Sequence, residues 1–289
     1  MPLVVEKLNH IYMKGGPYET QALSDISFTI QDGEFVGLIG HTGSGKSTLV
    51  QHLNGLLQPT SGRVLVDGTD LADKTADRKQ IRCKVGLVFQ YAENQLFEET
   101  VAKDIAFGPK NLGLDAGEID RRVREAMRQV SLDYDRISGK SVFDLSGGQM
   151  RRVAIAGVLA MKPSVLVLDE PCAGLDPHGR EEILGLIRRL HRESGVTIVM
   201  VSHSMDDVAQ LAERVMVMHR GHLVMDGRPE EIFTRGEELR KMGLDVPQVV
   251  QLGEQLRARG YEIPEQIYRM EDMQELLIRL LKKGEYHAQ

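Results

Sequence analysis

The fold is decided by Gly40-His41-Thr42-Gly43-Ser44-Gly45-Lys46-Ser47-Thr48, which follows the apolar run Phe35–Ile39 and opens into Thr48–Leu53. The apolar run predicts a buried strand, and the segment after the loop predicts a helix. Small residues let backbone N–H groups converge on phosphate oxygens, and the helix N-terminus adds partial positive charge. Lys46 is expected to reach the β- and γ-phosphates, and the Ser47 hydroxyl to bind Mg²⁺. An ordinary glycine-rich turn is the alternative, but the pattern arises by chance in roughly one chain per hundred of this length. We therefore interpret residues 40–48, the phosphate loop, as a nucleoside triphosphate site.

Composition and charge exclude several classes of protein. The chain has 289 residues and a formal net charge of -6, which argues against a protein built to grip nucleic acid. Its two cysteines, Cys83 and Cys172, lack the spacing of a metal site or a disulfide framework, so we expect a reducing compartment. We interpret Cys172 as a buried small residue and not as a redox switch. No apolar run approaches the ~18 residues that span a bilayer, so any membrane role is expected to be peripheral.

The first part of the chain is rich in short strand-like runs. Val4–Leu8, Ile26–Ile30 and Gly62–Val66 are apolar or alternating, and Asp32-Gly33 and Asp67-Gly68 supply turns between them. We expect antiparallel strands packed beside the strand that precedes the phosphate loop.

The middle of the chain combines a helical region with a β-α-β unit. Asp115 and Glu118 resemble a capping box at the start of an amphipathic helix. Further on, Ser164–Leu168 and Val196–Val201 are nearly continuous apolar runs, which is typical of strands buried on both faces. Helical periodicity over Arg180–Glu193 lies between them, so a parallel sheet is predicted.

The character of the sequence changes after about residue 230. Two amphipathic helices are expected, over Pro247–Arg259 and over Glu271–Lys283, the second followed by Gly284. Two roles are open for their apolar side chains: steadying a dimer, or folding back on their own chain. The side chains in question are Val249, Leu252, Leu276 and Leu280.

Two adjacent carboxylates end the first of the buried strands. Asp169 is placed to hold Mg²⁺, mostly through water, and Glu170 to orient and deprotonate an attacking water. A pair of carboxylates after a strand is weak evidence alone. Together with Lys46 and Ser47 it predicts hydrolysis of the triphosphate.

A second glycine-containing turn, Leu145-Ser146-Gly147-Gly148-Gln149, leads into another helix. Such a turn at a helix N-terminus is a second anion site. One chain already has a phosphate loop, so we expect this turn, called the Ser146 turn below, to face the nucleotide of a second subunit. Two chains would then enclose two ATP molecules between them. A simple helix cap is the alternative.

These motifs, in this order, resemble those of ATP-binding-cassette (ABC) ATPases. The resemblance covers roughly residues 3–230, and it is carried by the phosphate loop, Gln90, the Ser146 turn, Leu168-Asp169-Glu170, Ala173-Gly174-Leu175-Asp176 and His203. It implies an α/β fold of the P-loop NTPase type: a mixed, mainly parallel core sheet, an antiparallel β subdomain and a helical subdomain over about 93–162. Residues 231–289 would form a small helical C-terminal extension.

The resemblance also implies roles for single residues. Tyr12 would stack on adenine beside the ATP-binding phosphate loop, and Asp176 would communicate across the dimer. Gln90 would approach Mg²⁺ and the lytic water and sense a membrane partner, so the metal set becomes Ser47, Gln90 and Asp169. His203 would contact the γ-phosphate, and the catalytic set becomes Lys46, Gln90, Glu170 and His203. Plainer interpretations are an edge-strand aromatic for Tyr12, a polar strand end for Gln90 and a structural histidine for His203.

A narrower resemblance is to the ATPases of energy-coupling factor (ECF) transporters. It rests on Phe89–Val101, on Asp104–Pro109, on Gly40-His41-Thr42-Gly43 and on the short C-terminal extension. The chain looks like the second of two paralogous ATPases that pair in these complexes, a type related to the cobalt-transport ATPase. ATP hydrolysis with Mg²⁺ at a dimer interface would then drive uptake of a vitamin or a transition-metal ion. The expected location is the cytoplasmic face of the cell membrane.

The implied partners are a second ABC ATPase subunit, a paralogue or a second copy, and a transmembrane coupling subunit that docks near Gln90–Phe107. A substrate-binding membrane subunit would take part indirectly, and no nucleic acid is expected. The coupling helix would lie in a groove lined by Tyr91, Leu96, Phe97 and Val101; an ordinary internal linker is the alternative.

Three other functions remain as alternatives. An ATPase of another ABC importer, for amino acids as an example, shares the catalytic motifs and differs in the segment after Gln90 and in the tail. A soluble non-transport ABC ATPase would carry two cassettes or a long coiled-coil insertion. A stand-alone NTP-dependent kinase or switch has no use for the Ser146 turn.

Overall fold

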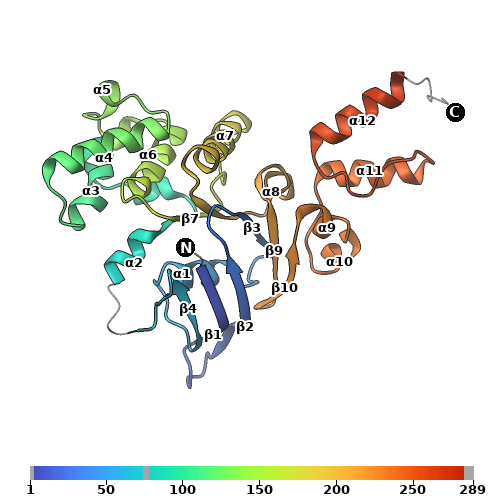
Figure 1. Ribbon diagram of the computed structural model, residues 1–289, viewed down its shortest axis with the longest axis horizontal. Helices are drawn as coiled ribbons and strands as arrows, with labels where there is room; N and C mark the ends of the chain where they lie inside the picture. The colour runs from blue at the N-terminus through green and yellow to red at the C-terminus, as the bar shows by residue number, and fades with distance from the viewer. Residues whose placement is uncertain (1–2, 74–77, 283–289) are drawn as a thin grey trace.

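The computed structural model describes residues 3–73 and 78–282, which form two β-sheets and a set of helices; the antiparallel sheet lies at the bottom of the view in Figure 1, and most helices lie above it. The first sheet is antiparallel, with the strand order β2-β1-β4-β5. Its strands are β1 (Leu3–Tyr12), β2 (Thr20–Ile30), β4 (Ser61–Val66) and β5 (Thr69–Asp70). Asp67 and Gly68 form the turn between β4 and β5, as expected. The predicted antiparallel strands are confirmed, although β1 and β2 are longer than the sequence runs.

The second sheet has six strands in the order β10-β9-β3-β8-β7-β6. Neighbours from β9 to β6 run parallel, and β9 and β10 pair antiparallel. The strands are β3 (Phe35–Gly40), β6 (Val85–Val88), β7 (Val165–Asp169), β8 (Thr197–Val201), β9 (Arg214–His219) and β10 (His222–Gly227). The predicted β-α-β unit is β7, α7 (Pro177–Ser194) and β8. It gives a parallel neighbour pair, which confirms the expected parallel sheet.

The central strands are buried on both faces because successive side chains enter different cores. One set joins the core under the helices: Phe35, Ile39, Leu166, Leu168, Ile198 and Met200. The alternate set joins the core shared with the antiparallel sheet: Val36, Leu38, Val165, Val167, Val199 and Val201. Helix α1 (Lys46–Leu53) packs in this second core through Leu49 and Leu53. The phosphate loop therefore rises from a strand that both cores hold in place.

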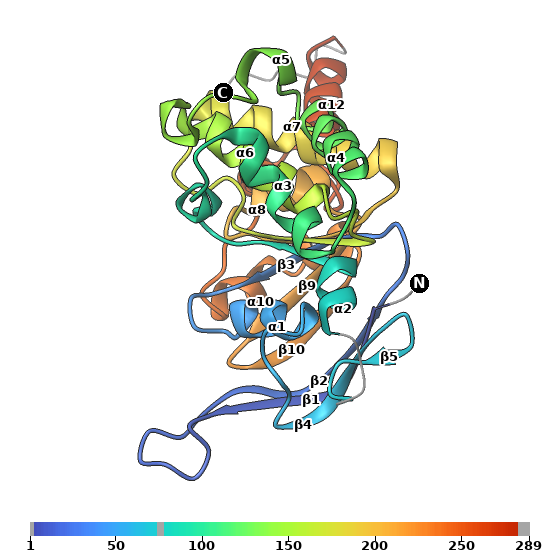
Figure 2. The ribbon, with the colours of Figure 1, turned by 90° about the vertical axis from the view of Figure 1, so that its left-hand side faces the viewer.

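A lobe of helices lies between β6 and β7 in the sequence and projects to one side of the sheets (Figures 1 and 2). It contains η1 (Ala92–Gln95), α3 (Val101–Asn111), α4 (Ala116–Gln129), α5 (Tyr134–Ile137), η2 (Val142–Asp144) and α6 (Gly147–Leu159). Helix α2 (Arg78–Lys84) precedes β6, and α8 (Met205–Leu211) follows β8. The lobe matches the predicted helical subdomain.

The start of α4 corrects one detail of the sequence analysis. Asp115 caps this helix by accepting hydrogen bonds from the backbone N–H groups of Gly117 and Glu118. The Glu118 carboxylate, however, accepts from Arg121 and Arg122. Two guanidinium donors one turn ahead attract it more strongly than a single backbone N–H, so the reciprocal half of the predicted capping box is absent from the described hydrogen bonds.

The chain beyond β10 forms α9 (Pro229–Phe233), α10 (Gly236–Lys241), α11 (Gln248–Ala258) and α12 (Met270–Lys282). The two predicted helices are α11 and α12, whereas α9 and α10 were not predicted. Lys283 and Gly284 lie outside the described residues. Phe233 and Leu239 are buried in the main core, so α9 and α10 pack against the part of the chain that contains the six-stranded sheet.

Helices α11 and α12 share a small core of their own. Val249 is buried there with Ile263 and Met273, and Leu276 and Leu280 pack against it. Three of the four side chains considered for dimerisation are thus used within the chain. Leu252, with 37% of its surface exposed, is the exception. Among the described helices, none combines the length and the apolar character that crossing a bilayer requires.

Candidate nucleotide site

Two glycines allow the phosphate loop to turn tightly between β3 and α1. A Cβ atom on Gly40 would lie 2.5 Å from both the Met218 carbonyl oxygen and the Ser44 Oγ atom. Gly45 has a φ of 103°, and a Cβ atom there would lie 2.8 Å from the Ala22 carbonyl oxygen. Only glycine combines this backbone conformation with such close approach. The loop therefore ends with its open N–H groups at the start of α1, a geometry that binds phosphate.

Lys46 and Ser44 are poised for an anion. The Lys46 ammonium folds across the loop and donates to the carbonyl oxygens of Gly40 and His41, at 2.6 and 3.1 Å. Burial lowers the pKa of Lys46, and the nearby Glu170 and Asp169 charges raise it in part. The Ser44 hydroxyl is buried and has no hydrogen-bond partner among the described residues. A phosphate oxygen would satisfy both groups.

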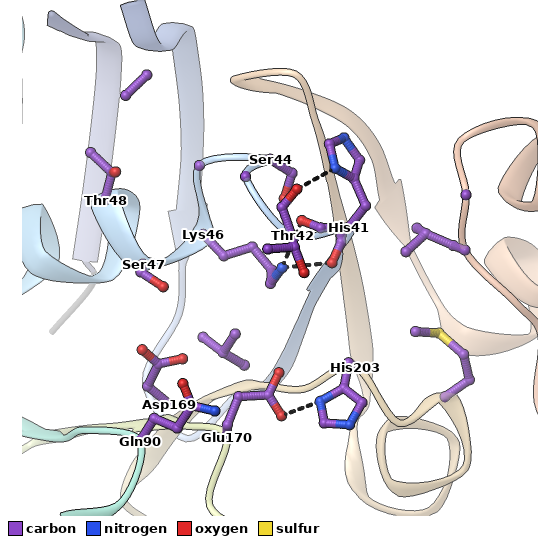
Figure 3. A pocket seen from close by; sticks show the side chains of 18 of the residues that line it. His41, Thr42, Ser44, Lys46, Ser47, Thr48, Gln90, Asp169, Glu170 and His203 are labelled. Atoms are coloured by element: carbon purple, nitrogen blue, oxygen red, sulfur yellow. Dashed lines mark hydrogen bonds and ion pairs between the residues drawn. The ribbon is translucent and has the colours of Figure 1, made fainter. Parts of the chain in front are cut away.

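The phosphate loop forms one wall of a cavity of about 730 Å³. The opposite walls bring together side chains from far apart in the sequence, namely Gln90, Asp169, Glu170 and His203 (Figure 3). All residues of the loop from Gly40 to Thr48 line this cavity. The sequence-predicted phosphate, metal and catalytic residues thus meet in one place.

Glu170 stands in a strained backbone conformation at the tip of β7. Its φ is 51°, which is unusual for a residue with a side chain, and its N–H donates to the Val201 carbonyl oxygen at 3.0 Å. Its carboxylate oxygen lies 2.7 Å from His203 Nδ1. A carboxylate oxygen accepts, so Nδ1 carries the proton and donates it. This bond orients Glu170 into the cavity, where a general base for water is needed (Figure 3).

Ser47, Gln90 and Asp169 place a hydroxyl, a carboxamide and a carboxylate on the wall of the same cavity. Burial raises the pKa of Asp169, the Glu170 charge raises it further, and Lys46 lowers it. Within residues 3–73 and 78–282, no group of three His, Cys, Asp or Glu side chains forms a metal cage. Magnesium prefers a few oxygen ligands together with waters and phosphate oxygens. The donor set fits a magnesium ion held jointly with the triphosphate.

The Ser146 turn is well formed but lies elsewhere. Ser146 is exposed and caps α6 by accepting from the Gln149 N–H, while the Gln149 side chain accepts from the Ser146 N–H. A Cβ atom added to Gly147 or Gly148 would have no neighbour within 4 Å in the described structure. None of these residues is among the described residues that line the phosphate cavity. One chain therefore does not bring its two predicted anion sites together.

Asp176 and Tyr12 also lie outside the described lining of the cavity. Asp176 is the N-cap of α7, where its carboxylate accepts from the Gly179 N–H at 2.7 Å. Tyr12, at the end of β1, is 39% exposed, and its hydroxyl lies 3.1 Å from the Thr48 Oγ1 atom. Tyr12 is therefore next to the phosphate loop without touching the phosphate space, as a nucleobase platform requires. Both roles stay predictions.

Comparison with known proteins agrees with this geometry. Residues 23–173 match the family described as ABC transporter. Over 284 residues the chain is 58% identical to an energy-coupling factor transporter ATP-binding protein EcfA2 of Clostridium perfringens, covering 98% of this chain and all of that one. A protein of the same name from Symbiobacterium thermophilum is 59% identical over 252 residues, which is 87% of each chain.

The chain belongs to the ATP-binding proteins of energy-coupling factor transporters, within the ABC transporter family. Solved structures show the ABC ATPase fold. The structure of cbiO1 from Clostridium perfringens, described as part of the ABC transporter complex cbiONQ, is 40% identical with a TM-score of 0.74, over 87% of this chain and 98% of that one. The dimeric ATP-binding cassette MJ0796 bound to ADP and Pi is 30% identical with a TM-score of 0.69, over 78% of this chain and 98% of that one.

The groove expected after Gln90 exists in this ECF-type ATPase, but its lining differs from the prediction. A cavity of about 560 Å³ is lined by Leu96 and Phe97, as expected, and also by Phe107. Val101 is fully buried in the core, and Tyr91 is not part of the described lining. The reason is helix periodicity: Val101 and Ile105 share the inward face of α3, so neither can face the groove.

Two further features of the ATPase escaped the sequence analysis. Gly243, Leu244 and Asp245 of the C-terminal extension contribute to the phosphate cavity. No local pattern signals this, because it depends on how α10 packs. The other is Arg151, a buried residue two positions after Gln149 that donates to Glu93 and to the carbonyl oxygens of Pro171 and Ala173. A charged residue on the inward face of a helix was the available signal.

Proposed function

We propose that this chain is the ATP-hydrolysing subunit of an energy-coupling factor importer, working as one half of an ATPase dimer. The observation that carries the proposal is the division of the site. The phosphate loop, Gln90, Asp169, Glu170 and His203 share one cavity, while the Ser146 turn is exposed on α6. Each half-site is formed in advance and lacks the other half.

The chemistry assigned to the chain's own residues follows from their placement. Lys46 and the loop N–H groups bind the β- and γ-phosphates and stabilise charge on the transferring phosphoryl group. Glu170 orients a water and accepts its proton. Ser47, with Gln90 and Asp169 acting partly through water, would hold Mg²⁺, which would supply positive charge against the phosphates.

His203 has a more restricted role than a simple γ-phosphate contact suggests. Its Nδ1–H is committed to Glu170 at 2.7 Å. A neutral ring then leaves Nε2 with a lone pair, which cannot donate to a phosphate oxygen. Contact with the γ-phosphate therefore requires an imidazolium, or release of Nδ1 from Glu170. Either change would report the arrival of the triphosphate to the general base.

Association of two subunits completes each site. The exposed Ser146 hydroxyl and the Gly147 and Gly148 N–H groups would bind the γ-phosphate held by the partner's phosphate loop. Hydrolysis removes that bridging phosphate and favours opening. Asp176, the N-cap of α7, would communicate with the partner across the dimer.

The groove along Leu96, Phe97 and Phe107 is proposed to receive a coupling helix of a membrane subunit. Phe97 is 59% exposed, and its ring packs edge-to-face on Phe107 at 4.9 Å. The chain would thus act peripherally at the cytoplasmic face of the membrane. The cargo, a vitamin or a transition-metal ion, would contact a separate membrane subunit.

Mild detergent extraction of the tagged chain, followed by mass spectrometry, tests this assignment. We expect a cassette ATPase and a membrane subunit with several helices to co-purify. The assembly should hydrolyse ATP, and Ser146→Arg in every copy should abolish hydrolysis while leaving ATP binding. A strictly monomeric preparation that hydrolyses ATP at the full rate would refute the two-subunit site, and exclusively soluble companions would refute the importer.

A further inference from the structure

We propose that His10 and His52 are positioning residues that hold the Tyr12 ring as a nucleobase platform at a fixed place beside the phosphate loop. The inference rests on the proposed ATP site. Both imidazoles are buried, His52 completely and His10 with 8% of its surface exposed. They join β1, which carries Tyr12, to α1, which begins in the phosphate loop.

With both rings neutral, the hydrogen-bond distances fit one arrangement of protons. His52 Nδ1 lies 2.7 Å from the Thr48 carbonyl oxygen, which can only accept, so Nδ1 carries a proton. His52 Nε2 of the neutral ring is then an acceptor, and it lies 3.1 Å from His10 Nδ1. His10 Nδ1 must therefore donate. The same proton also faces the Gln58 carbonyl oxygen at 3.2 Å.

Burial disfavours the charged form of His52. Burial lowers the pKa of His52, although its hydrogen bond to Thr48 acts in the opposite direction. A proton added to His52 Nε2 would point at the donating Nδ1 of His10. The chain of hydrogen bonds from Thr48 through His52 to His10 is thus directional. It ends at His10, whose Nε2 atom is buried without a hydrogen-bond partner among the described residues.

Tyr12 is held at both ends by this chain. Its ring packs edge-to-face on the His10 ring, with centroids 4.4 Å apart and an interplanar angle of 80°. Its hydroxyl lies 3.1 Å from Thr48 Oγ1. Tyr12, Thr48, His52 and His10 therefore form a closed circuit of contacts. The circuit begins and ends at Thr48, the last residue of the phosphate loop.

This circuit is suited to positioning. Tyr12 keeps 39% of its surface exposed while its edge and its hydroxyl are fixed. A purine stacks well on an aromatic ring whose orientation is set in advance, because no side-chain freedom is lost on binding. Two apolar side chains could fill the same space without needing hydrogen-bond partners, so filling space does not account for two histidines here. We infer that the directional hydrogen bonds of His10 and His52 fix the distance between the Tyr12 ring and the phosphate loop.

The test separates base recognition from phosphate recognition. Dissociation constants of the full chain for ATP and for inorganic tripolyphosphate, which lacks a base, are measured by calorimetry with Mg²⁺. We expect His10→Ala and the polar variant His10→Asn to weaken ATP binding about five- to tenfold and to leave tripolyphosphate binding within about twofold. His191→Ala is the matched control. His191 lies on α7, and its ring also forms a hydrogen bond with a backbone carbonyl oxygen, that of Gly33, at 2.7 Å.

A double-mutant cycle identifies the route. Tyr12→Ala should produce a similar ATP-specific loss, and His10→Ala should add nothing in the Tyr12→Ala background. Equal weakening of ATP and tripolyphosphate by His10→Ala would overturn the proposal, as would additive losses or an ATP affinity unchanged by His10→Ala. Failure of the unaltered chain to bind either ligand would instead refute the proposed function. His10→Asn keeps a buried polar group, so it decides the matter if His10→Ala does not fold.

Discussion

Replacement of Arg151 by methionine should be among the most destabilising single changes in this chain. Arg151 lies on α6 and is only 2% exposed. Its Nε and Nη2 atoms donate to both carboxylate oxygens of Glu93, at 3.0 and 2.7 Å. Its Nη1 atom donates to the carbonyl oxygens of Pro171 and Ala173, at 2.7 and 2.9 Å. One side chain thus joins the Ser146 helix to the segment after Gln90 and to the segment after Glu170.

The magnitude follows from what the change leaves behind. Methionine preserves much of the buried volume, so the loss is chiefly one of hydrogen bonds. Breaking a buried ion pair by removing one partner costs about 3–5 kcal/mol, because the remaining charge is uncompensated. Glu93 is 20% exposed and gains some water, while the two carbonyl oxygens lose their donors. We expect the free energy of unfolding to fall by about 3–5 kcal/mol.

Urea unfolding followed by circular dichroism measures this loss, since the chain contains no tryptophan. Arg152→Met is the matched control, because Arg152 makes a single ion pair with the partly exposed Glu182 and should cost far less. Arg151→Met combined with Glu93→Leu should cost less than the sum of the two single changes. A loss below about 1 kcal/mol, or one equal to that of Arg152→Met, would refute the reasoning.

Three further outcomes are expected. Glu170→Gln should keep ATP binding, slow hydrolysis by at least about a hundredfold and accumulate an ATP-bound dimer in light scattering; near-normal hydrolysis would exclude Glu170 as the base. Burial raises the pKa of Cys172 to about 12. In a Cys83→Ser variant at pH 8, iodoacetamide should therefore react with the folded Cys172 thiol about a thousandfold more slowly than with the unfolded one, and the folded rate should rise about tenfold per pH unit; equal rates in the folded and unfolded states would contradict the burial. Phe97→Asp should abolish co-purification of the membrane subunit and spare ATP binding, whereas Tyr18→Asp, on the exposed β1–β2 loop, should spare both.

The central sheet was predictable because its strands carry their own signal. Strands buried on both faces are nearly continuous apolar runs, and β7 and β8 read that way in the sequence. The phosphate loop was predictable for a related reason, because the residues expected to bind phosphate are adjacent in the sequence. Glu170 and His203 could be named from position, but their 2.7 Å contact depends on how β7 and β8 pair.

The features that escaped prediction depend on tertiary packing. Helices α9 and α10 have five and six residues, too few to show helical periodicity. They are held by Phe233 and Leu239 in a core built elsewhere. Val101 was wrongly predicted to line the groove. Its apolar character does not indicate which face of α3 it occupies, and that face packs in the core. Asp245 lines the phosphate cavity because of the way α10 packs, and no sequence motif predicts this position.

The proposed division of the site would allow ATP itself to control association. The Ser146 turn is already ordered by its reciprocal hydrogen bonds with Gln149, so little conformational freedom is lost when a second subunit arrives. The phosphate cavity is likewise formed within one chain. With ATP bound, the γ-phosphate would join the two surfaces, and with ADP bound that contact would be missing. A ligand shifts an equilibrium only by its differential affinity for the two states. In the proposed dimer, the energy that separates the closed state from the open one would therefore reside in the contacts of the γ-phosphate, and cleavage of that phosphate would reverse closure.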